Sequence, residues 1–132
     1  MPTIFTRIIA GEIPGTFVHR DDQCVVFMSI NPLAPGHSLV VPIVECDHWV
    51  DLSESLAAHL FAVAYRVGRA QQQAFACDKV ALIIAGYEVP HTHLHVIPTT
   101  NMSQLNFANA AAGIGRDELQ AGADAISAQM NS

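Results

Sequence analysis

A short histidine-rich stretch constrains the fold of this chain more than any other. Residues 90–98 read Pro-His-Thr-His-Leu-His-Val-Ile-Pro, so three histidines alternate with other residues between two prolines. This alternation is typical of a β-strand, in which side chains at positions i, i+2 and i+4 point to the same face. We therefore predict a strand with His91, His93 and His95 on one face. At roughly 3.3 Å per residue the row spans about 13 Å, so the central imidazole has a neighbour on either side.

A row of imidazoles suits two kinds of site. A neutral imidazole can attack phosphorus or a carbonyl carbon while its neighbours supply protons and hydrogen bonds. Alternatively, the row can bind a metal ion through neutral ring nitrogens. A single histidine on a strand is usually only a polar surface residue. Three within five positions favour chemistry, because the whole chain has seven histidines in 132 residues.

Composition limits the partners that the chain can have. With 132 residues, 51% of them apolar, residues 1–132 are expected to form a single domain with one full hydrophobic core. The formal charge of −6 disfavours nonspecific binding to nucleic acid or to anionic lipid. We therefore expect neither a nucleic-acid nor a membrane partner, and an anionic substrate must be held locally by imidazoles, backbone amides or a helix N-terminus.

Other sequence features predict a cytoplasmic protein. No apolar run reaches the ~20 residues of a membrane helix, and residues 1–14 lack the basic start and apolar core of a signal peptide. Cys24, Cys46 and Cys77 are odd in number and far apart, which favours reduced thiols over a disulfide framework.

Apolar periodicity predicts an α+β fold. Five antiparallel strands are expected at 16–19, 24–29, 37–42, 79–85 and in the histidine stretch. A short helix over 3–10 begins at the N-cap Thr3 and ends at Gly11, and a long helix runs from the cap Ser53 to about residue 76. A C-terminal helix is marked by apolar residues at helical spacing, Leu119, Ala123, Ile126 and Met130.

Three stretches together resemble the histidine triad (HIT) family. Residues 90–98 match its signature, His-φ-His-φ-His-φ-φ with φ apolar, and Thr92 is the softest match. Residues 4–14 resemble the opening helix of the family, and residues 35–42 resemble the strand that carries its fourth histidine. The similarity covers about residues 3–100, leaves 101–132 as a variable tail, and is closest to the dimeric nucleoside phosphoramidate hydrolases.

The resemblance implies a reaction and a set of roles. His93 would attack the α-phosphate of an AMP-like purine nucleotide and carry the nucleotidyl group before water releases it. His95 would contact the phosphate oxygens or the leaving group, while His91 and His37 would fix tautomers and ring orientations. No cofactor is implied. The protein would be a homodimer, for which the long helix and the fourth strand offer apolar surface.

The resemblance also implies a nucleoside pocket between the first helix and the second strand. Its expected residues are Ile4, Phe5, Ile8, Ile13, Phe27, Ser29, Ile30 and Asn31, together with Gly86, Tyr87 and Val89 before the histidines. Counting back along the strand from His93, we expect Tyr87 to cover the mouth of the site and to donate to the leaving group. The same count turns Glu88 to the opposite face.

The chain departs from the family at several positions. Ser29 replaces an aspartate that binds ribose hydroxyls, and Gly86-Tyr87-Glu88 replaces a Gly-Gln-Ser. His48 falls where zinc-binding members keep a metal histidine, but their paired cysteines correspond to Thr3 and Thr6, so we expect no bound metal.

Three interpretations follow from the sequence. The first is a nucleotidyl-histidine hydrolase, and the second is a metal-binding protein that uses His91, His93 and His95. The third is a nucleotide-binding protein without turnover. The sequence favours the first. Of the remaining histidines, His59 is expected on the solvated side of the long helix.

Overall fold

The computed structural model describes residues 2–131, and its elements follow the order expected from the sequence. The helices are α1 (Ile4–Ile9), α2 (Glu54–Ala74) and α3 (Arg116–Met130), and the strands are β1 (Phe17–Arg20), β2 (Cys24–Met28), β3 (Ser38–Pro42), β4 (Lys79–Ile83) and β5 (Leu94–Thr99). Short 3-10 helices lie at Trp49–Asp51, Met102–Leu105 and Phe107–Asn109. Across residues 2–131, no helix combines the length and apolar character needed to cross a membrane.

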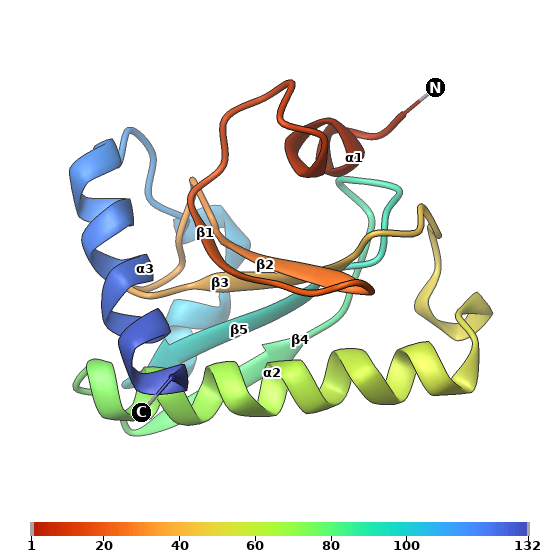
Figure 1. Ribbon diagram of the computed structural model, residues 1–132. Coiled ribbons are helices and arrows are strands. Elements are labelled where there is room, and N and C mark those ends of the chain that lie inside the picture. Colours follow the sequence, from red (N-terminus) through yellow and green to blue (C-terminus); the bar gives the residue numbers. More distant parts are fainter. Residues whose placement is uncertain (1, 132) are drawn as a thin grey trace.

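The strands form one antiparallel sheet in the order β1-β2-β3-β5-β4. Helices α2 and α3 cover one face and α1 lies on the other, as Figure 1 shows. The predicted α+β fold, with five antiparallel strands, one long helix and a shorter helix at each end, is confirmed. Because β5 inserts between β3 and β4, the histidine strand lies beside the strand that follows His37.

Local capping explains where the two N-terminal helices begin. The Thr3 hydroxyl accepts a hydrogen bond from the Thr6 amide, and the Ser53 hydroxyl accepts one from the Leu56 amide. Each satisfies one of the backbone N–H groups that a helix start leaves unpaired. Both caps were predicted from the sequence, whereas α2 ends at Ala74, two residues before the expected end.

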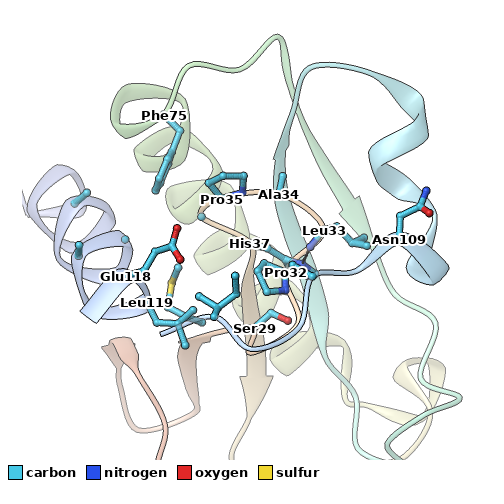
Figure 2. A pocket seen from close by; sticks show the side chains of 17 residues that line it. Ser29, Pro32, Leu33, Ala34, Pro35, His37, Phe75, Asn109, Glu118 and Leu119 are labelled. Atoms are coloured by element: carbon cyan, nitrogen blue, oxygen red, sulfur yellow. Dashed lines mark hydrogen bonds between the residues drawn. The ribbon is translucent and has the colours of Figure 1, made fainter. Parts of the chain in front are cut away.

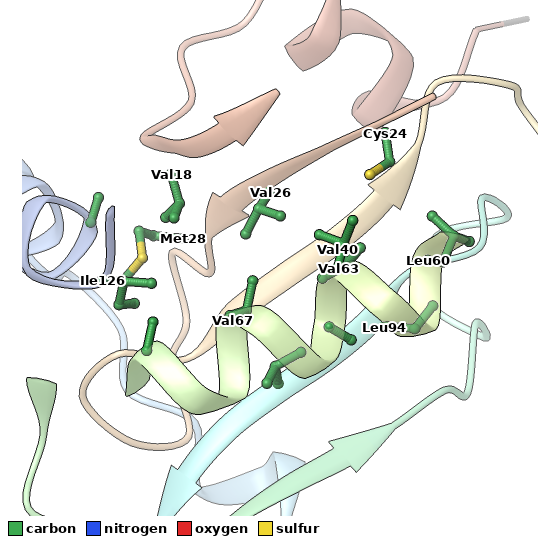
Figure 3. Packing of buried hydrophobic residues seen from close by; sticks show 14 of the residues in the cluster. Val18, Cys24, Val26, Met28, Val40, Leu60, Val63, Val67, Leu94 and Ile126 are labelled. Atoms are coloured by element: carbon green, nitrogen blue, oxygen red, sulfur yellow. The ribbon is translucent and has the colours of Figure 1, made fainter. Parts of the chain in front are cut away.

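Strand alternation divides the apolar side chains between the two faces of the sheet. On the α2 face, the strand residues Val26, Val40 and Leu94 belong to one cluster with Leu60 and Val63 of α2 (Figure 3). Burying one such side chain contributes about 1.5–3 kcal/mol. On the α1 face, a smaller cluster combines the helix with alternate strand residues, Phe5, Val25, Phe27, Leu39 and Val41.

The histidine stretch is only partly a strand, which corrects the prediction. β5 begins at Leu94, so His91 and His93 precede it. The register that pairs Val40 with Leu94 would pair Pro42 with Thr92, but proline has no amide hydrogen to donate. Thr92 instead donates its amide and hydroxyl to the Cys46 carbonyl, at 2.7 and 2.8 Å. The preceding strand is also shorter than predicted, since β4 ends at Ile83.

Gly36 supplies a stability test for the turn that leads into β3. It has φ +92°, and an added Cβ would lie 2.6 Å from the ring of Phe75. Gly36→Ala should therefore lower the free energy of unfolding, measured by chemical denaturation, by more than the about 1–2 kcal/mol that a left-handed residue costs. Gly113→Ala is the matched control, because Gly113 has φ +72° with nothing within 4 Å of an added Cβ. Equal losses in the two variants would show that the Phe75 contact adds nothing.

Candidate active site

A cavity of about 410 Å³ lies on the α1 face of the sheet. Helix α1 forms one wall, β2 and the turn after it form the floor, and the segment after β5 forms the opposite wall. Most of the predicted site residues line it: Ile4, Phe5, Ile8, Ile13, Phe27, Ser29, Ile30, Asn31, Val89, His37, His93 and His95. The fold thus brings residues that lie up to about ninety positions apart in the sequence together around one cavity.

His93 is held in one tautomer by the backbone. Its Nδ1 lies 2.7 Å from the carbonyl oxygen of His91, and an oxygen of this kind only accepts. Nδ1 therefore carries the proton, and Nε2 keeps its lone pair. The ring is 5% exposed and packs edge-on against Phe5, with centroids 4.9 Å apart. Nε2 makes no hydrogen bond to any of residues 2–131, so this nitrogen is available to a ligand.

The tautomer of His95 is set by a relay, a chain of two hydrogen bonds that begins at a backbone amide. The Leu33 amide donates to Nδ1 of His37 at 3.0 Å, so in the neutral ring the proton of His37 lies on Nε2. That Nε2 lies 2.9 Å from Nδ1 of His95 and donates to it. The proton of neutral His95 is therefore on Nε2. Because the rings of His93 and His95 are 4.8 Å apart, an acceptor nitrogen and a donor nitrogen lie side by side.

His91 acts from outside the cavity, although it was predicted beside His93. Its Nε2 donates to the Pro42 carbonyl at 2.8 Å, and its Nδ1 accepts from the Thr3 hydroxyl at 2.7 Å. The side chain is fully buried and does not line the cavity. It joins the start of α1 to the end of β3, and its own carbonyl positions His93.

Burial keeps the three interacting rings uncharged. Loss of hydration, reinforced by repulsion from the other histidines, lowers the pKa of His37 to about 3 and that of His95 to about 4. Burial also lowers the pKa of His93, although its bond to the His91 carbonyl and the charge of Glu88 oppose the shift. An imidazole is charged only below its pKa, so all three are neutral at pH 7 and His93 keeps its lone pair.

Comparison with known proteins identifies this arrangement. A HIT domain matches residues 10–102, more than half of the chain. The chain belongs to the HIT family. The purine nucleoside phosphoramidase of Escherichia coli K12 is 35% identical over 103 residues, which cover 72% of this chain and 85% of that protein.

Two further relatives support the same family. Adenylylsulfatase HINT3 of Arabidopsis thaliana is 31% identical over 100 residues, covering 72% of this chain and 51% of that protein. A Hit-like protein from Bartonella henselae superposes with a TM-score of 0.85 and 27% identity, covering 96% of this chain and 95% of that one. The resemblance on which the fold was predicted is thereby confirmed, and two HIT proteins of similar sequence carry hydrolase names.

The segment before the HIT histidines differs from the prediction. Tyr87 is 97% exposed and does not line the cavity, so its side chain does not cover the mouth as predicted. Its donation to a leaving group stays a prediction. Gly86 also lies outside the lining, whereas Glu88 and Val89 belong to it. The prediction counted by twos along a strand, but residues 84–93 are irregular and the alternation does not hold there.

The part of the cavity wall that follows β5 was not predicted from the sequence. Phe107 and residues 110–112 line the cavity, and the Phe107 ring lies 5.1 Å from that of His95. The only local signal was Phe107, an isolated aromatic residue in a polar segment. It follows Asn106, whose side chain caps the 3-10 helix by accepting a hydrogen bond from the Ala108 amide. This segment lies beyond residue 102, where the HIT match ends.

The residues at the zinc position that the resemblance implied do not fit the ion. The Thr3 amide and the Thr6 hydroxyl donate to Glu45 at 2.8 and 2.7 Å, and the Thr3 hydroxyl is bonded to His91. A structural zinc site uses thiolates and imidazoles, and this cluster contains no thiol. Its hydrogen bonds instead anchor the start of α1.

A second cavity, of about 440 Å³, lies behind His37 on the side of α3 (Figure 2). Phe75, Pro35 and Leu119 are among its mostly apolar lining residues, and Glu118 is a charged one. It shares Met28, Ser29, His37 and Ala111 with the first cavity, but none of His91, His93 and His95 lines it. The reactive nitrogens therefore belong to the α1-face cavity.

The relay predicts the tautomer of each ring. At neutral pH, long-range ¹H–¹⁵N correlation spectra should show His93 protonated at Nδ1, and His37 and His95 protonated at Nε2. At pH 5.5 the rings of His37 and His95 should still be neutral, because their pKa values are about 3 and 4. A His93 signal with its proton on Nε2 would contradict the arrangement from which the nucleophile is inferred. His37→Leu is the internal check, since leucine has no hydrogen-bond donor to fix the proton of His95 on Nε2.

Proposed function

We propose that this HIT protein is a nucleotide hydrolase or nucleotidyl transferase that acts at the α-phosphate of purine nucleoside phosphoramidates or related nucleotides. The reaction passes through a nucleotidyl group carried on His93. One observation supports this most strongly: the His91 carbonyl holds the proton of a buried His93 on Nδ1, so that Nε2 is a neutral nucleophile in the cavity.

The proposed chemistry has two displacements. The lone pair of His93 Nε2 forms a bond to the α-phosphorus, and the bond from phosphorus to the leaving amine breaks with its electron pair. The leaving amine takes a proton from solvent. Water then attacks the same phosphorus and releases a proton to solvent, and the electron pair of the Nε2–phosphorus bond returns to His93. In the intermediate the ring carries a positive charge, which the His91 carbonyl stabilises through Nδ1.

His95 is the proposed donor to the phosphoryl oxygens. Its Nε2–H has no protein acceptor within residues 2–131, and its ring centroid is 4.8 Å from that of His93. This neutral N–H group can donate a hydrogen bond and so stabilise the negative charge that develops on the phosphoryl oxygens. The relay from Leu33 through His37 is then a positioning device, because it keeps this N–H in place.

The apolar half of the cavity is the proposed site of the purine base. Phe5 and Phe27 pack edge-to-face at 5.5 Å, and Ile8 completes an apolar wall suited to a flat ring. Ser29 lines the same cavity and is the proposed partner of the ribose. Its hydroxyl makes a weaker, uncharged hydrogen bond than a carboxylate would, so we infer a modest affinity for the nucleoside.

The alternative of a three-histidine metal site receives less support. Both ring nitrogens of His91 are already bonded to Thr3 and Pro42, so this ring cannot join His93 and His95 around one ion. A nucleotide-binding protein without turnover stays as the second candidate, since it requires the same cavity. The two differ in whether a covalent intermediate forms.

Mass spectrometry of the protein, quenched rapidly after mixing with an adenosine phosphoramidate, tests the proposal. The parent should carry one adenylyl group, which peptide mapping should place on His93. His93→Ala should carry none, because the attacking nitrogen is gone, and His48→Ala is the matched control at an exposed histidine. Parent protein that binds the nucleotide yet shows neither the adduct nor turnover would favour the binding-only alternative.

We also propose that the protein is a homodimer, joined through α2 and β4. β4 is an edge strand, and its outer region adjoins a groove lined by Phe61, Tyr65 and Leu82. These three side chains are 43%, 64% and 44% exposed, which leaves a contiguous apolar surface of the kind that subunits cover. The cytoplasmic location predicted from the sequence stays a prediction.

The dimer proposal predicts a change of mass in solution. The parent should sediment as two chains at micromolar concentration, and Tyr65→Glu combined with Leu82→Glu should sediment as one, because two charges would be buried in the interface. Met102→Glu is the control, since Met102 is 80% exposed but lies outside that groove. A parent that sediments as a single chain would overturn the assignment.

A further inference from the structure

Four potential metal ligands meet where the β1–β2 hairpin approaches α2, on the face of the sheet away from His93. They are His19 of β1, Asp21 of the turn, Cys24 of β2 and His59 of α2. Nε2 of His19 and Nε2 of His59 each lie 2.9 Å from the same oxygen, Oδ2 of Asp21, and Sγ of Cys24 lies 3.6 Å from it. His59 therefore does not lie free in solvent, as the sequence had suggested; its ring is turned to the hairpin.

The turn aims the carboxylate at the two rings. Oδ1 of Asp21 accepts from the amides of Gln23 and Cys24 at 2.8 and 2.9 Å, which fixes the plane of the group. Oδ2 is thereby directed at the imidazoles of His19 and His59.

Oδ2 has more donors than it can accept well. A carboxylate oxygen offers about two lone-pair directions, and here two ring N–H groups and one thiol converge on it. A cation would replace these donors, because a coordinating thiol gives up its proton to solvent and the His59 ring can bind through Nε2 once its proton has moved to Nδ1.

We propose that Asp21, Cys24 and His59 form a zinc-binding site that is separate from the nucleotide cavity. Their ligand atoms all lie within 4.8 Å of one another, and no other such group of three occurs in the part of the chain that the structure describes. Zinc bonds of about 2.0–2.3 Å place tetrahedral ligands roughly 3.3–3.8 Å apart. Binding therefore requires the wider separations in this group to shrink by up to about 1 Å and the 2.9 Å contact between Asp21 and His59 to lengthen slightly. Thiolate, imidazole and carboxylate are the ligand types that zinc takes.

His19 is the proposed positioning residue of this site. Its bond to Oδ2 orients the carboxylate, as the second layer of contacts does around many metal ligands. The fourth coordination position is left to water. The ion would link β2 to α2 through Cys24, which is 0% exposed in the cluster beneath α2 (Figure 3). This proposal departs from the sequence prediction of no bound metal, which considered only the zinc position of Thr3, Thr6 and His48.

Titration of metal-free protein with cobalt and with zinc tests the site. Cobalt should bind one ion per chain and produce the sulfur-to-cobalt charge-transfer band that only thiolate ligation gives. His59→Gln and Cys24→Ala should lose more affinity than the about 10–100-fold expected for a positioning residue, and His19→Gln should fall within that range. His48→Gln and His93→Ala should bind like the parent, because neither residue belongs to the site.

Thermal unfolding gives a second measurement. Zinc should raise the Tm of the parent and of His48→Gln but not that of His59→Gln, whose side chain lies at the surface edge of the cluster. His59→Gln decides the question if Cys24→Ala, at a fully buried position, does not fold. Absence of the thiolate band, or equal metal affinity in the parent and His59→Gln, would overturn the proposal. The cluster would then serve only to link the hairpin to α2 by hydrogen bonds.

Discussion

The hydrogen-bonded relay from Leu33 through His37 to His95 is the interaction on which the site depends. It exists only because β3 pairs with β5 in the register that sets Leu39 opposite His95. Burying two imidazoles costs free energy unless their nitrogens are paired, and each nitrogen of His37 has a partner in this relay. A shift of one residue in the strand pairing would turn His95 to the α2 face and place an apolar side chain in the cavity.

Gln71 of α2 holds the same register from the opposite face. Its fully buried amide donates to the carbonyls of Gly36 and Val96, at 2.9 and 2.8 Å, which lie on the segments that carry His37 and β5. The side-chain oxygen has no partner in the part of the chain described, a cost of about 1–3 kcal/mol. The two backbone contacts offset that cost, because they join the long helix to both strands of the relay. The helix that covers the core thus also fixes the geometry of the site.

The sequence predicted those parts of the structure that local chemistry determines. Thr3 and Ser53 cap their helices because a hydroxyl before an apolar helical pattern has one obvious partner, and the apolar pattern located β2 and β3 within one residue at either end. The resemblance supplied the residues of the cavity, and most of them meet there. What it could not supply were contacts between distant segments: the wall after β5 at Phe107, or the approach of His59 to Asp21. Neither pair has a periodic signal that links its two members.

The wrong prediction at residues 87 and 88 has a physical cause with chemical consequences. The prediction extended strand alternation through a segment in which Pro42 and Pro90 prevent strand pairing. It therefore assigned Tyr87 and Glu88 to the wrong sides of the chain. Glu88 consequently lines the cavity, and its charge raises the pKa of His93 against the lowering by burial. Because Glu88 is exposed, water screens its charge, and burial remains the first cause of the lowered pKa of His93.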